Sequence, residues 1–177
     1  LRRRLTDRRA PGPPAGPIPA YNPDEMLNQT EPAPMGELFI RDTPVRWVRE
    51  HVAGFWDRVA RGAWEPQTYR AIERHVTPDT TFVDFGANIG AVTLYAARKA
   101  ARVISFEPDP LSRAMLLANV AANPDVAERI TVVAKAIHDG KAPIRFGSQT
   151  AGGDSMSSSV LPNLKTVWPV EAITPDA

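Results

Sequence analysis

The chain has 177 residues, a formal net charge of +1 and no cysteine, and 43% of its residues are hydrophobic. This length predicts one domain with enough apolar residues for a core. The small net charge argues against nucleic-acid binding, and the lack of cysteine excludes disulfides, thiolate-bound zinc and thiol nucleophiles. No apolar run approaches the ~20 residues that cross a bilayer. We therefore expect a soluble, cytoplasmic protein without nucleic-acid or membrane partners.

The first 36 residues are rich in Arg and Pro and show no hydrophobic periodicity. Such a segment buries too little apolar area to offset the entropy lost on ordering. We predict a flexible, solvated tail over 1–36, with a basic arm that touches an acidic partner as the alternative.

Two helices are predicted in the next segment, 37–78, which we expect to pack on the core. Thr43 and Pro44 are typical of a helix start, and apolar residues then recur every three or four positions. This pattern predicts a helix over about 43–61 with a buried apolar stripe. A second helix is predicted over 66–76.

A strand, a glycine-rich turn, a helix and a second strand follow in the predicted domain 79–177. The strands are predicted at 81–85 and 102–106, the helix over 89–99, and Glu107 comes directly after the second strand. In such a unit the glycines let the backbone approach a ligand, and the helix N-terminus directs free N–H groups to it. The pattern predicts a site for an adenosine-containing cofactor, with Glu107 on the ribose hydroxyls.

The spacing of the glycines indicates which cofactor binds. Dinucleotide folds use G-x-G-x-x-G, whose middle glycine leaves room for a pyrophosphate. This chain has Asn88 between Gly86 and Gly90, and Asp84 two residues before the turn. A carboxylate there would repel phosphates but can hold the α-ammonium of S-adenosylmethionine, which has no phosphate. We therefore predict S-adenosylmethionine, and a nucleotide-binding oxidoreductase is a weaker alternative.

Further alternation of helices and strands predicts the fold class. A helix is expected from Pro110, and 130–134 reads as a buried parallel strand. Together these elements predict an α/β fold with a Rossmann-like, doubly wound, mostly parallel sheet that binds ligands at the carboxyl ends of its strands. Ile137 and Asp139 follow the third strand and are expected to contact adenine, although Asp139-Gly140 is also typical of a tight turn.

The last part of the chain carries weaker signals. Residues 147–159 are rich in Gly, Ser and Thr and predict a plain loop, with a lid ordered by substrate as the alternative. Residues 164–173 alternate weakly around Pro169, which predicts an edge strand or two short strands.

Three blocks of the sequence resemble those of the FkbM-type methyltransferases. They are DFGANIG at 84–90, FEPDP at 106–110 and AIHDG at 136–140, in this order. They look like the D-x-G-A-N-x-G, F-E-P and A-[IL]-x-D blocks of that family, and the resemblance runs from about 64 to 174. The resemblance implies a class I, S-adenosylmethionine-dependent enzyme that methylates a hydroxyl group on a sugar or natural product.

The resemblance also implies further cofactor contacts. Family members carry an E-P-x-T stretch close to the cofactor, and residues 65–68 match it. The expected cofactor contacts are Asp84, Gly86, Ala87, Asn88, Gly90, Glu107, Pro108, Ile137, Asp139, Glu65 and Thr68. Glu65 could equally serve as a helix cap without a ligand. No metal site is expected and no catalytic residue is assigned, since His138, the histidine nearest the expected site, falls on its adenine side.

The family's I-D-x-E-G block does not occur in the sequence, and fewer strands can be counted than the seven of a complete class I fold. We expect the N-terminal part of a larger enzyme, incomplete at its C-terminus. The alternative is a non-catalytic, cofactor-binding fragment or pseudoenzyme of the same fold. The acceptor and the oligomeric state are not predicted.

Overall fold

The computed structural model describes most of the chain after its N-terminal segment. The described residues are 36–48, 50, 53–139, 143–150, 152–153, 157–160 and 162–175. Residues 1–35 of the predicted tail and Gly140 of the third sequence block lie outside them. Gly36, the last residue of the predicted tail, begins the first strand.

An antiparallel hairpin opens the described chain, so the helix predicted over 43–61 is wrong in its first half. Strand β1 (Gly36–Ile40) pairs with β2 (Thr43–Trp47) across a turn in which Arg41 has a φ of 58°. Thr43 and Val45 are buried while the residues between and after them are exposed, which is the two-residue period of a strand.

Two asparagine side chains from later in the chain explain why this segment is extended. Asn123 accepts from the backbone N–H of Arg46 over 3.0 Å and donates to its carbonyl over 2.7 Å. Asn119 accepts from the backbone N–H of Val48 over 2.8 Å. These bonds satisfy backbone groups that a helix would use internally. Among the described residues of the predicted range, only the short helix α2 (Phe55–Ala60) is helical.

The second predicted helix is confirmed to within one residue. Helix α3 (Pro66–His75) begins at a proline, whose missing N–H costs nothing in the first turn of a helix. Its buried side chains are Tyr69 and Ile72.

The centre of the molecule is a mixed α/β unit built on a parallel sheet of three strands. Strands β3 (Thr81–Phe85), β4 (Arg102–Phe106) and β5 (Ile130–Val133) are hydrogen-bonded in the order β3-β4-β5. They alternate with α4 (Ala91–Ala97), α5 (Pro110–Ala121) and the single turn α6 (Pro124–Ala127). Strand and helix positions predicted for this unit are confirmed.

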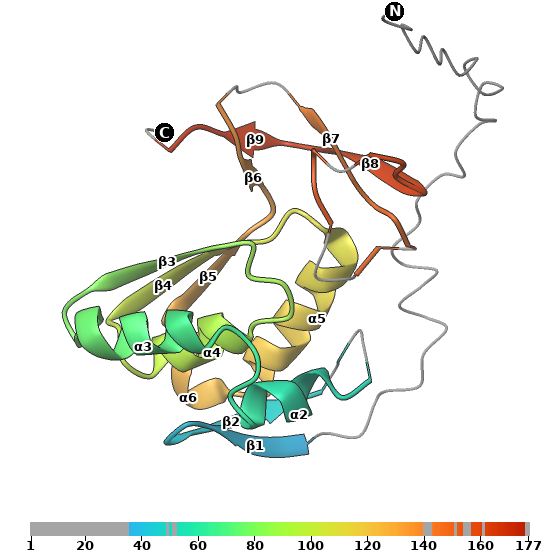
Figure 1. The fold of residues 1–177 in the computed structure, drawn as a ribbon. Helices are drawn as coiled ribbons and strands as arrows, with labels where there is room; N and C mark the ends of the chain where they lie inside the picture. Colours follow the sequence, from blue (N-terminus) through green and yellow to red (C-terminus); the bar gives the residue numbers. More distant parts are fainter. Residues whose placement is uncertain are drawn as a thin grey trace, which may run out of the picture.

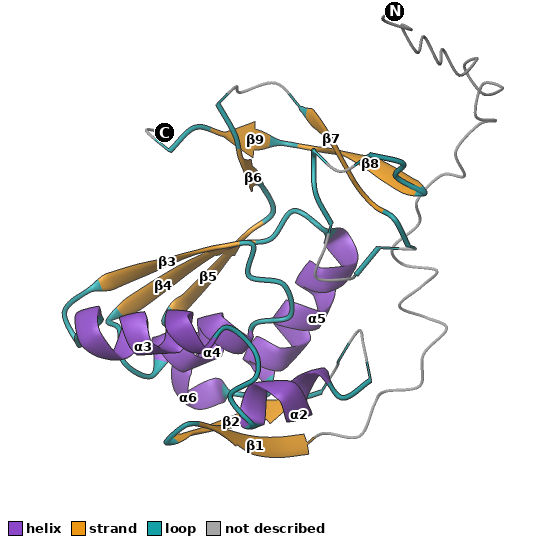
Figure 2. Cartoon of the chain, viewed as in Figure 1, coloured by secondary structure: helices purple, strands orange, loops and turns teal. Residues whose placement is uncertain are grey.

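The described helices lie on one side of this sheet (Figures 1 and 2). All seven residues of α4 are buried, and the six apolar ones belong to a core that also contains hairpin and α2 residues such as Val45 and Phe55. On the other face of β3, Val83 and Phe85 are 41% and 61% exposed. The prediction of a buried strand over 130–134 is wrong in its burial, because the residues of β5 are partly buried or exposed.

Two small sheets complete the described chain and lie beyond the end of α5 in Figure 1. Strand β6 (Ala136–Ile137) runs parallel to β9 (Ala172–Ile173), and β7 (Ile144–Ser148) pairs antiparallel with β8 (Thr166–Val170). The segment around Pro169 therefore forms two short strands, which confirms the second of the two alternatives predicted for it.

Candidate functional site

The turn after β3 is shaped by three residues with positive φ. Gly86, Asn88 and Gly90 have φ values of 77°, 50° and 97°. A Cβ atom on Gly90 would come within 2.6 Å of a methyl carbon of Leu116, so both conformation and space require glycine there. Asn88 occupies the left-handed region without being glycine, which asparagine tolerates better than most residues.

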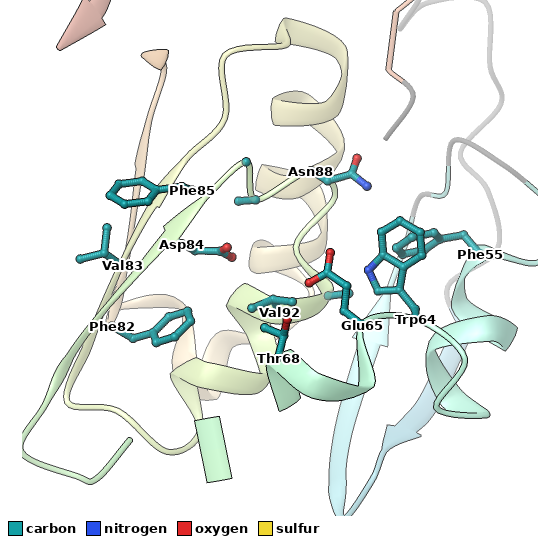
Figure 3. A pocket seen from close by; sticks show the side chains of 13 residues that line it. Phe55, Trp64, Glu65, Thr68, Phe82, Val83, Asp84, Phe85, Asn88 and Val92 are labelled. Carbon is teal, nitrogen blue, oxygen red and sulfur yellow. The ribbon is translucent and has the colours of Figure 1, made fainter. Parts of the chain in front are cut away.

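A cleft of about 320 Å³ opens beside this turn and along β3 (Figure 3). Its size is at the lower end of the range of small-molecule sites. The lining residues come from the α2–α3 region, β3, the turn and α4, and they are Phe55, Trp64, Glu65, Thr68, Phe82, Val83, Asp84, Phe85, Gly86, Ala87, Asn88, Ala91 and Val92. The structure thus brings together six of the eleven predicted contacts, namely Glu65, Thr68, Asp84, Gly86, Ala87 and Asn88.

Asp84 is a buried carboxylate at the carboxyl end of β3. Its Oδ2 accepts a hydrogen bond of 2.6 Å from the hydroxyl of Thr93 on α4. Burial raises the pKa of Asp84 to about 6, the Thr93 hydrogen bond opposes that shift, and the charge of Glu65 adds to it. A positive charge in the cleft would favour the ionised form.

Glu65 is the second carboxylate of the cleft. It adopts a left-handed conformation at the N-cap of α3, yet its side chain makes no capping hydrogen bond. The interpretation of Glu65 as a helix cap is therefore wrong for the side chain. Figure 3 shows the carboxylates of Glu65 and Asp84 pointing toward one another from opposite walls of the cleft.

Asn88 presents an unsatisfied side chain at the same place. Both polar atoms of its carboxamide are buried and have no hydrogen-bond partner among the described residues. Buried amide groups are nearly always paired, so this pair of atoms is a natural contact for a ligand.

Glu107 lies behind the turn and does not line the cleft. It is 5% exposed, and its two carboxylate oxygens accept from the backbone N–H groups of Asn88 over 2.6 Å and Asp109 over 2.8 Å. Burial raises the pKa of Glu107 to about 8, against the effect of these two hydrogen bonds. In this structure Glu107 ties the turn to the loop after β4, and ribose binding by Glu107 stays a prediction.

The other predicted contacts lie outside the cleft lining. Gly90 is the N-cap of α4 and lies against Leu116, and the carbonyl of Pro108 accepts from Arg113 over 3.3 Å. Ile137 is in β6, and the side chain of Asp139 is 94% exposed and paired with His138. The structure does not bring Ile137 and Asp139 to the cleft.

Seven lining residues of the cleft were not predicted from the sequence, and neither was Thr93, which bonds to Asp84 from outside the lining. Phe55 and Trp64 form an aromatic wall of the cleft, with their rings 5.0 Å apart. Thr93 was not considered, although its position three residues after Gly90 on a helix facing the sheet could have indicated that it reaches back to β3.

Metal-binding clusters and membrane-spanning helices are both absent from the part of the chain that the structure describes. No group of three or more His, Cys, Asp or Glu side chains there is placed to hold a metal ion. None of the helices there has the length and apolarity needed to cross a membrane.

Comparison with known proteins gives distant structural similarities. No protein-family model matches the sequence, and no curated protein matches it. Among solved structures, the chain is similar to a transferase from Pyrococcus horikoshii, with 28% identity over 38% of this chain and 26% of that one and a TM-score of 0.34. It is similar to P. horikoshii TYW2 in complex with MeSAdo, with 18% identity over 68% and 65% and a TM-score of 0.37.

A third similarity is to methyltransferase FkbM from Methylobacillus flagellatus, with 18% identity over 52% of this chain and 36% of that one and a TM-score of 0.30. The chain thus spans between 26% and 65% of the length of these three proteins.

Proposed function

We propose that the protein binds S-adenosylmethionine in the cleft beside β3 and transfers its methyl group to a hydroxyl oxygen of a small sugar or natural-product acceptor. The observation that carries this proposal is the pair of carboxylates, Asp84 and Glu65, that face one another in one cleft beside a glycine turn. The order of the three FkbM-like sequence blocks supports it.

The charge of the cleft selects the class of ligand. Burial raises the pKa of Asp84, the charge of Glu65 adds to that rise, and a bound cation would oppose both effects. An α-ammonium group can contact both carboxylates, whereas a pyrophosphate would add negative charge. The cleft therefore favours an amino-acid-bearing nucleoside over a dinucleotide.

The other lining residues fit the remainder of such a ligand. The carboxamide of Asn88 can donate to a carboxylate or a ribose hydroxyl, since both of its polar atoms lack a described partner. Phe55 and Trp64 provide apolar surface close to the carboxylates, where water must be kept from the reacting atoms.

Methyl transfer requires the acceptor oxygen, the methyl carbon and the sulfur to lie in line. S-adenosylmethionine, when bound, supplies the activated methyl group. The chain's contribution is to hold the amino-acid end through Asp84 and Glu65, and such positioning can lower a barrier by ~7 to 11 kcal/mol. As the C–O bond forms and the C–S bond breaks, the hydroxyl proton passes to a base. None of the residues above is assigned as that base.

Calorimetric titration tests the cofactor. We expect S-adenosylhomocysteine to bind wild-type protein and NADH not to bind. Tighter binding of NADH would overturn the proposal. Transfer of labelled methyl from S-adenosylmethionine to a panel of sugar and polyketide hydroxyls then separates an enzyme from the alternative, a non-catalytic cofactor-binding protein of the same fold.

Asn88→Gly is expected to change the unfolding free energy and the affinity for S-adenosylhomocysteine in opposite directions. Glycine removes the left-handed strain and the unpaired carboxamide, so we expect a change in unfolding free energy of about 0 to 1 kcal/mol in the stabilising direction. Binding of S-adenosylhomocysteine should weaken about tenfold, which is ~1.4 kcal/mol for a lost hydrogen bond. Urea denaturation and calorimetry measure the two effects.

The matched control is Asn163→Gly, because Asn163 has a similar φ of 56° but is exposed and does not line the cleft. It should leave affinity unchanged. Unchanged affinity in Asn88→Gly as well would exclude the carboxamide as a ligand contact.

A further inference from the structure

Two buried hydroxyl groups lie beneath Asp84. The Thr93 hydroxyl donates to Asp84 Oδ2 over 2.6 Å, and Thr93 Oγ1 lies 2.9 Å from Ser105 Oγ. Thr93 comes from α4 and Ser105 from β4, where it is the register partner of Asp84, and both are 0% exposed. Three elements therefore meet in one buried polar chain.

The direction of these two hydrogen bonds follows from counting protons. A hydroxyl group has one proton to donate. Thr93 donates its proton to Asp84, so Ser105 must donate to Thr93 Oγ1. Donation from Ser105 polarises the Thr93 hydroxyl and strengthens its bond to the carboxylate.

The hydroxyl of Thr93 has an unusual hydrogen-bond partner for a threonine in a helix. A threonine inside a helix commonly bonds the carbonyl four residues earlier, which here belongs to Ile89. That carbonyl accepts from Asn119 Nδ2 over 2.9 Å instead, and Thr93 turns to Asp84. Because a valine would fill the same buried space, packing alone does not explain a hydroxyl at this position.

Only one oxygen of Asp84 is engaged in this way. None of the hydrogen bonds of the described residues uses Asp84 Oδ1, and Figure 3 shows the carboxylate pointing into the cleft toward Glu65. We propose that Thr93, supported by Ser105, is a positioning residue that keeps Asp84 ionised with its second oxygen turned toward the ammonium group of the ligand. This inference rests on the proposed function.

The charge state of Asp84 gives a readout that packing would not change. Burial raises its pKa to about 6 and Thr93 opposes that shift, so removing the hydroxyl should raise the pKa further. Two other titratable groups interact with Asp84, namely the charge of Glu65 at the N-cap of α3 and the buried hydroxyl of Tyr69 on α3.

The test compares two ligands that share the adenosine part. S-adenosylhomocysteine carries the ammonium group, and 5′-methylthioadenosine lacks the whole amino-acid end. In calorimetry at pH 7, Thr93→Val should weaken binding of the first about tenfold or more and of the second less than twofold. Thr93→Ser, which restores the hydroxyl, should recover most of the loss. Equal weakening of both ligands would show a merely structural role and overturn the proposal.

Thr43→Val is the matched control, since Thr43 is also a buried threonine whose hydroxyl donates to an aspartate, Asp42, but in the hairpin. It should change neither affinity. Failure of wild-type protein to bind either ligand would refute the proposed function instead. In that case carbon-13 titration of the Asp84 carboxyl group decides. A titration midpoint about one pH unit higher in folded Thr93→Val than in wild type or in folded Thr93→Ser supports the positioning role, and an unchanged midpoint overturns it.

Discussion

Replacing Asp84 by asparagine is expected to weaken S-adenosylhomocysteine binding about 30- to 100-fold at pH 7. This loss corresponds to about 2 to 2.7 kcal/mol, which is the range for a hydrogen bond between charged partners. Asparagine preserves the size of the side chain and can still accept from Thr93, so the variant removes mainly the charge. Calorimetric titration of both proteins measures the effect.

The same variant should be more stable than the wild type. The pKa of Asp84 is about 6 in the folded protein against a usual value of 3.8, because burial disfavours its ionised form. The folded state therefore binds a proton more tightly than the unfolded state, and stability falls as the pH rises from about 4 to about 6. Above that window ionisation costs roughly 1 to 3 kcal/mol, which Asp84→Asn should recover at pH 7 in urea denaturation.

Affinity should depend on pH in the opposite sense. An ammonium ligand needs ionised Asp84, so wild-type affinity should be nearly constant above pH 7 and fall by about tenfold per unit below pH 6. The profile of Asp84→Asn should be flat through this window. Asp79→Asn, an exposed aspartate before β3, is the control that should bind as the wild type does. If Asp84→Asn binds with wild-type affinity, Asp84 is not the ammonium contact.

Local signals were sufficient to predict the α/β unit. The strands at 81–85 and 102–106 are rich in β-branched and aromatic residues; Gly86 follows the first directly, and Pro108 lies two residues after the second. Each of these signals agrees with the parallel pairing that the structure shows. Asp84 and the turn residues could be assigned to one edge of the sheet for the same reason.

The hairpin could not be predicted because its stabilising contacts are distant in sequence. Val45 fits a helical stripe and a strand equally well, and the turn contains Arg41 and Asp42 instead of a glycine dipeptide. The deciding hydrogen bonds come from Asn119 and Asn123, more than seventy residues away. Strand formation here depends on tertiary context, which propensity does not contain.

The misplaced contacts have a similar cause. Ile137 follows the third strand in sequence, but β6 pairs with β9 and lies away from the cleft. Conversely, Trp64 and Phe55 reach the cleft through the packing of α2 and α3, which no local pattern encodes. The turn residues lie at the cleft where their place in the sequence predicted, and Glu65 and Thr68 were expected there only through the family resemblance. Phe55 and Trp64, which packing brings to the cleft, were not predicted.

Asp109→Ala is expected to cost about 3 to 5 kcal/mol of unfolding free energy, the largest stability loss that we predict. The Asp109 carboxylate is 0% exposed and receives four hydrogen bonds. Oδ1 caps α5 by accepting from the backbone N–H groups of Leu111 and Ser112 over 2.8 and 3.3 Å. Oδ2 accepts from the backbone N–H of Gly153 over 2.8 Å and from the hydroxyl of Ser157 over 2.7 Å.

These two functions of Asp109 have separate readouts. Loss of the cap contributes about 0.5 to 2 kcal/mol, and the remainder comes from buried donors that lose a charged acceptor. Asp109→Asn can still cap the helix through its carbonyl oxygen, but its amide group cannot accept from the Gly153 N–H. It should therefore cost only about 1 to 2 kcal/mol while amide exchange at Gly153 becomes faster.

Asp57→Ala is the matched control, because Asp57 also lies in the first turn of a helix but is exposed. It should cost less than about 0.5 kcal/mol in urea denaturation. Unchanged exchange at Gly153 in Asp109→Asn would mean that the carboxylate does not hold the glycine-rich segment against α5. Faster exchange there, with the α5 amides still protected, would assign that attachment to Oδ2 alone.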